Sequence, residues 1–135
     1  MRHIRMIVVS LALIYGASLL MYWRGVDLSV DGIRGYQTGL LPMIAAVLIV
    51  IIVTVIYKKE RSGVVIALAA CVLIVMELIY LLMWSGSISS TWSLSFVVRH
   101  MHMGAIVSLV AACALLIAGI MQCLRRVDNK VSQSE

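Results

Sequence analysis

Four long runs of apolar residues, separated by short polar segments, dominate the chain. The runs cover residues 6–23, 39–57, 64–84 and 103–124. Each approaches the ~20 residues that an α-helix needs to cross ~30 Å of hydrocarbon. The pattern therefore predicts an all-α integral membrane protein, in which four transmembrane helices form a single bundle domain over residues 1–126.

The first apolar run follows a basic start and has to be distinguished from a secretory signal. It is longer than the roughly 7 to 15 residues of a signal core, and the bulky segment 19–23 follows Ala17 and Ser18, where cleavage needs small residues. We therefore expect a retained span.

Two of the linking segments alternate apolar and polar side chains, which is typical of a strand with one covered face. They are residues 26–31 and 92–96. The sequence makes them candidates for a small β-ribbon outside the membrane, within loops 24–38 and 85–102. The alternative is ordered loop lying on the bundle. Residues 127–135 are polar, and we expect a disordered tail there.

Composition supports lipid as the solvent of this chain. Apolar residues make up 63% of it, charged residues 13%, and the mean hydropathy is +1.08. A soluble domain carries about 25% charged residues. The net charge of +5 comes from basic residues clustered at the ends of apolar runs, so it does not indicate nucleic-acid binding.

The basic residues also predict an orientation. Of the 11 Lys and Arg residues, Arg24, Arg34 and Arg99 flank one side, and the other eight flank the side of both termini and of the 58–63 link. The positive-inside rule then places both termini in the cytoplasm and the protein in the cell membrane. Aromatic residues fall near the outer boundary, namely Tyr22, Trp23, Tyr36, Trp84 and Trp92.

Small residues at helical spacing predict where the spans pack, because membrane helices associate through close backbone approach. The fourth span carries the clearest stripe and should be the most enclosed. The second span is almost wholly aliphatic and should face lipid. The predicted packing residues are Gly104, Ser108, Ala112, Ala70, Gly63 and Gly16.

Glu77 is the one ionisable residue deep in a predicted span. A charged side chain there is costly, so we expect it to face the bundle and to find hydrogen-bond donors. At matching depth the first span offers Tyr15 and Ser18, and the fourth offers Ser108. Three interpretations stay open: an internal tie between helices, a docking point for a partner's polar residue, and a proton- or cation-coupling group.

A second cluster of interest precedes the fourth span, where His100, His102 and Met103 offer ligands that suit Cu(I). The simpler interpretation is a headgroup-facing segment in which Met is an apolar filler. No ligand set is complete by itself, and no cofactor is predicted.

No nucleophile with an adjacent base, paired carboxylates or phosphate-binding loop occurs, so we do not expect an enzyme. The leading hypothesis is an accessory subunit that binds a larger membrane protein, as transporter subunits, assembly factors and immunity-type proteins do. The alternative is a homo-oligomeric proton- or cation-coupled transporter that uses Glu77. The expected partners are thus the lipid bilayer and either a larger membrane protein or further copies of this chain.

Overall fold

The structure is a computed structural model, which describes residues 2–25, 32–57, 62–89 and 93–132. The chain is mostly helical, with one small sheet. In chain order the elements are α1 (Arg2–Ser18), β1 (Tyr22–Arg24), β2 (Ile33–Arg34), η1 (Gly35–Gln37), α2 (Leu41–Tyr57), α3 (Ser62–Ser89), α4 (Leu94–His100) and α5 (Met103–Ser132).

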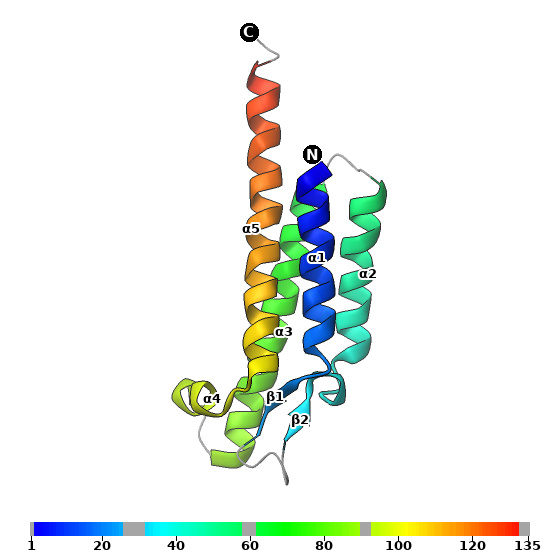
Figure 1. Cartoon of the computed structure of the whole chain (residues 1–135). Helices are drawn as coiled ribbons and strands as arrows, with labels where there is room; N and C mark the ends of the chain where they lie inside the picture. The colour runs from blue at the N-terminus through cyan, green and yellow to red at the C-terminus, as the bar shows by residue number, and fades with distance from the viewer. Residues whose placement is uncertain (1, 26–31, 58–61, 90–92, 133–135) are drawn as a thin grey trace.

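The four long helices α1, α2, α3 and α5 lie side by side (Figure 1). Helix α5 packs most extensively on α3 and then on α1, while α2 packs on α3 and α1. We call the end that holds β1, β2, η1 and α4 the cap end. The opposite end, where α1 begins and α5 finishes, is the tail end (Figure 1).

Two of the described helices are long and apolar enough to cross a membrane. They are α3, over Ser62–Ser87, and α5, over Met103–Arg125. The apolar parts of α1 and α2, His3–Ser18 and Leu41–Ile56, are shorter. Length and composition are thus consistent with a membrane location, although the core helices of soluble proteins pass the same test.

Helix α1 ends at Ser18, so the predicted continuation of the first span to residue 23 is wrong. The amides of Leu19, Leu20 and Met21 each bond to a carbonyl three residues back, which tightens and ends the helix. The chain then enters β1, where Trp23 is fully buried. An apolar run by itself does not distinguish a continuing helix from a buried strand.

A small ribbon exists at the cap end, with partners other than those predicted. Strands β1 and β2 pair antiparallel, and Arg24 forms an isolated bridge to Met101. The segment 94–96 is helical in α4, because Ser93 caps that helix by accepting a hydrogen bond from the Phe96 amide. The other predicted strand, residues 26–31, and Trp92 lie outside the described residues.

Two helices are longer than the apolar pattern indicates. Helix α3 continues to Ser89 and α5 to Ser132, where disorder was predicted from residue 127 onward. A formed helix adds one hydrogen bond per residue, so it readily continues past the end of its apolar face.

On α3, Gly63, Ala70 and Glu77 of the expected small-residue stripe are all buried. Gly63 meets α5 at a close crossing, where a Cβ on Gly119 would lie 2.9 Å from the Gly63 carbonyl oxygen and 2.7 Å from the Ala67 nitrogen. The absence of both side chains is what lets the two backbones approach.

On α5 the stripe Gly104, Ser108 and Ala112 is likewise buried, as predicted. A Cβ on Gly104 would meet the carbonyl oxygen of Tyr22 at 2.6 Å, so this glycine admits the strand rather than a helix. Gly16 does not mark a close crossing within this chain, since a Cβ there would have nothing within 4 Å. The face that α1 buries is Val8, Ala12, Tyr15 and Ser18.

Candidate functional site

Three polar side chains from three helices meet in the interior of the structure. Glu77 lies in α3, Tyr15 near the end of α1, and Ser108 in the second turn of α5. Glu77 and Ser108 are 0% exposed and Tyr15 is 1% exposed. We call these three residues the polar centre.

Both carboxyl oxygens of Glu77 have a hydroxyl partner. The Tyr15 hydroxyl donates to Oε2 at 3.3 Å, and the Ser108 hydroxyl donates to Oε1 in a short contact. Because the partners come from different helices, the carboxyl group joins α1, α3 and α5 at one point. In the structure Glu77 faces inward and accepts from Tyr15 and Ser108, two of the three partners expected from the sequence.

Ser18 does not reach Glu77, contrary to the sequence prediction. Its hydroxyl donates to the backbone oxygen of Tyr15 at 2.6 Å, a local bond that serine commonly makes three residues back along a helix. The Ser18 carbonyl instead accepts from Nε1 of Trp23 at 3.0 Å. Ser18 therefore helps to end α1 and lies outside the polar centre.

The surroundings of the polar centre are apolar. Leu73 and Leu81 lie one turn on either side of Glu77 on α3 and are fully buried, and no cationic side chain among the described residues pairs with the carboxyl group. The Ser108 hydroxyl also lies 2.9 Å from the Ala105 carbonyl oxygen. Since a hydroxyl has one proton, it donates to one of these acceptors at a time. The cluster can therefore hold α1, α3 and α5 together, and the Glu77 carboxyl group can bind one proton.

The two histidines among the predicted metal ligands lie within hydrogen-bond distance of backbone carbonyl oxygens. Nδ1 of His100 lies 3.0 Å from the Phe96 oxygen, Nε2 of His102 lies 2.9 Å from the Gly25 oxygen, and Met103 is largely exposed. Within the described ranges, no group of three or more His, Cys, Asp or Glu side chains is placed to hold a metal ion.

A cluster at the cap end was not predicted from the sequence. Nε of Arg24 donates to the Tyr80 hydroxyl at 2.9 Å, and the guanidinium carbon lies 4.9 Å from the ring centre of Trp84. Phe96 and His100 extend the aromatic contacts, with Phe96 5.5 Å from Trp84 and 4.3 Å from His100. We call Tyr80, Trp84, Phe96 and His100 the aromatic cluster. Its sequence signal is weak, because its residues come from two separate segments.

The fold and the polar centre together define the class of this chain only coarsely, as a mainly helical protein with two helices able to span a membrane. No protein-family model, no curated protein and no solved structure matches it.

Proposed function

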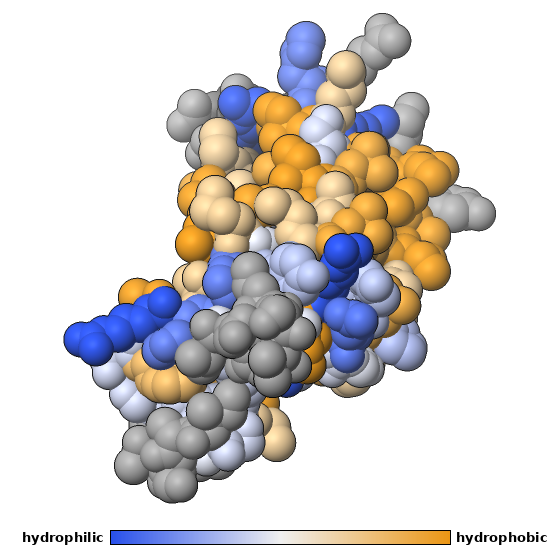
Figure 2. Space-filling model, turned by 60° about the horizontal axis from the view of Figure 1, so that its bottom comes forward, coloured by the Kyte–Doolittle hydropathy of each residue, from blue (hydrophilic) through white to orange (hydrophobic). Residues whose placement is uncertain are grey.

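We propose that the protein is a multi-pass membrane protein in which α1, α2, α3 and α5 all cross the bilayer. Helices α1 and α2, at 17 residues each, reach the lower limit of about 17 to 25 residues for a span. Figure 2 supports this, since on the visible face hydrophobic residues cover the middle of the long helices and hydrophilic ones lie toward both ends. Exposed Leu13 and Ile14 on α1, and Ile49 and Val53 on α2, suit contact with lipid.

The orientation follows from charge. In the sequence, eight of the 11 basic residues flank the termini and the 58–63 link, and this bias supports cytoplasmic termini with the cap end outside. A cell-membrane location is part of the same proposal.

Within the membrane, the protein acts as an accessory subunit that binds a larger membrane protein. The observation that supports this best is that all the hydrogen-bond partners of Glu77 in the polar centre belong to the same chain. Glu77 is 0% exposed and satisfied by Tyr15 and Ser108, so it holds the chain's own helices together. A bundle fastened in this way keeps its apolar sides available for a partner helix. Neither an enzyme nor a nucleic-acid-binding role is proposed.

One observation favours the alternative, a proton-coupled transporter. A carboxyl group within hydrogen-bond distance of two hydroxyls is a chemically reasonable proton site. Its burial counts against a pathway lined by Glu77 from several copies, since such a carboxyl would have to be accessible between the copies.

The deciding experiment extracts a tagged chain at native abundance in a mild detergent and identifies the proteins that copurify. The same preparation, reconstituted in vesicles, is tested for pH-driven proton flux, with Glu77→Gln as the variant. The accessory role predicts one membrane protein recovered in stoichiometric amount with both forms, and no flux from either. Flux that is present in the wild type and lost in Glu77→Gln would favour the transporter and overturn the accessory role.

A further inference from the structure

Helix α4 has two unlike sides. Phe96, Val97 and His100 face inward, where Phe96 and His100 pack with Trp84 of α3. On the other side, Leu94 and Val98 are 61% and 62% exposed and lie one helical turn apart. The aromatic contacts fix α4 in place, so its outer side is a defined surface.

Helix α4 lies to one side of the long helices at the cap end (Figure 1), and only two residues separate its end at His100 from the start of α5 at Met103. Met103, at that start, is 63% exposed, and Ile106 and Val110 continue the exposed apolar face of α5. In the orientation proposed above, α4 therefore lies at the level of the outer headgroups, above lipid-facing residues.

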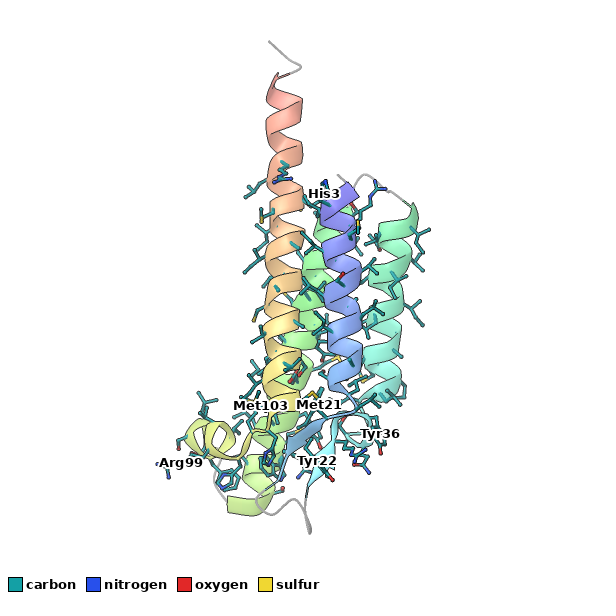
Figure 3. All side chains as sticks on the ribbon, viewed as in Figure 1. His3, Met21, Tyr22, Tyr36, Arg99 and Met103 are labelled. Carbon is teal, nitrogen blue, oxygen red and sulfur yellow. The ribbon has the colours of Figure 1, made fainter. Side chains whose placement is uncertain are left out.

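Arg99 supplies a charge at the same place. Its side chain is exposed on the outer side of α4, directed away from the long helices (Figure 3). Arg24 stacks on Trp84 and Arg34 on Tyr22, whereas Arg99 has no hydrogen bond, ion pair or ring contact within the described part of the chain. A guanidinium group binds phosphate oxygens with two parallel hydrogen bonds.

We propose that α4 and the first turns of α5 form a binding site for an anionic phospholipid of the outer leaflet. Arg99 binds the lipid phosphate, Leu94 and Val98 contact the upper part of an acyl chain, and the α5 face from Met103 to Val110 contacts the rest. The site rests on the proposed membrane-spanning arrangement and is independent of the accessory role. The charge of Arg99 is complementary to an anionic headgroup, and the apolar side chains suit an acyl chain better than water.

The test uses the purified full chain in detergent, incubated with phosphatidylglycerol or phosphatidylcholine, and counts bound lipids by native mass spectrometry. The wild type should retain more phosphatidylglycerol than phosphatidylcholine. Arg99→Gln should lower the retention of phosphatidylglycerol about fivefold, the factor expected for one basic residue at an anionic surface. Arg34→Gln is the matched control, because it removes an exposed cap-end arginine that stacks on Tyr22, and should change retention little. Val98→Ser should weaken retention of both lipids.

Equal retention by Arg99→Gln and the wild type, or an equal fall with Arg34→Gln, would overturn the site. Equal retention of phosphatidylglycerol and phosphatidylcholine by the wild type, with an acidic protein segment bound at Arg99 instead, would also overturn it. Failure here is distinct from failure of the proposed function, since a chain recovered with the membrane fraction but without a partner would still bind lipid. Melting curves of the variants show whether each is folded, because Arg99 is exposed and its replacement should leave the fold intact.

Discussion

Tyr15 carries one of the two hydroxyl groups that reach Glu77, and its contribution is measurable. Tyr15→Phe should lower the free energy of unfolding in detergent by about 0.5–1.5 kcal/mol, the range for hydrogen bonds inside membrane proteins. Tyr36→Phe is the control, because Tyr36 is exposed near the cap end, and should cost less than about 0.5 kcal/mol. Equal losses from the two substitutions would contradict a role for the polar centre in stability.

A double-mutant cycle separates this bond from the general effect of the substitution. In a Glu77→Leu background, Tyr15 retains a buried hydroxyl without its acceptor, so Tyr15→Phe should be neutral or stabilising there. A loss that persists undiminished in this background would show that the hydroxyl acts through some other contact.

Two buried tryptophans provide a second comparison between single residues. The Trp23 indole donates to the Ser18 carbonyl, whereas the Trp84 indole nitrogen is buried with no partner in the described part of the chain. Both Trp→Phe changes remove similar volume, but only Trp23→Phe removes a hydrogen bond, because the Ser18 carbonyl then keeps the Met21 amide as its one donor. Trp23→Phe should therefore cost about 0.5–1.5 kcal/mol more than Trp84→Phe in equilibrium unfolding. The reverse order would refute the assigned hydrogen bond.

The crossing of α3 and α5 depends on the absence of a side chain at Gly119. Gly119→Ala would place a Cβ 2.7 Å from the Ala67 nitrogen, and the two helices would have to separate. We expect a loss of about 1–3 kcal/mol in unfolding free energy.

Gly16→Ala is the matched control for the crossing, since it adds the same methyl group to a helix where it meets nothing. It should be neutral, or stabilise by up to about 1 kcal/mol through helix propensity. Similar losses for both glycines would contradict the close approach of α3 and α5.

How far the sequence predicts these elements depends on periodicity. The inward stripe of α3, with Gly63, Ala70 and Glu77, is evident because small residues recur every seven positions and Glu77 is costly in lipid. Gly16 shows the limit of that argument, because a small residue marks a packing position only if a second helix crosses there.

The cap end was harder to predict, because short segments carry too few residues for a period to decide. The alternation in residues 92–96 indicates a strand, yet the Ser93 cap favours the helix α4. Strand β1 begins within the apolar run that was expected to be helical, so its own residues do not indicate a strand. Its pairing with β2 depends on contacts with other parts of the chain. Only the three-dimensional structure brings Arg24 onto Trp84.

At the scale of the whole molecule, the lengths of the helices do not by themselves fix the number of membrane crossings. Helices α3 and α5 pass the length test, while α1 and α2 are shorter. The four-span proposal instead uses the side-by-side packing of all four helices, with Tyr15 of α1 bonded to Glu77 of α3. If α3 crossed the bilayer and α1 stayed outside it, the buried hydrogen bond between Tyr15 and Glu77 would have to be broken.

The most direct test of the four-span arrangement is the side of the membrane from which single cysteines are labelled. In a background with Cys71, Cys113 and Cys123 replaced by Ala, His3→Cys and Thr38→Cys mark the two sides of α1. A membrane-impermeant maleimide should label Thr38→Cys in intact cells and His3→Cys only in inverted vesicles. Labelling of both positions from the cytoplasmic side would show that α1 does not cross the bilayer and would contradict the four-span arrangement.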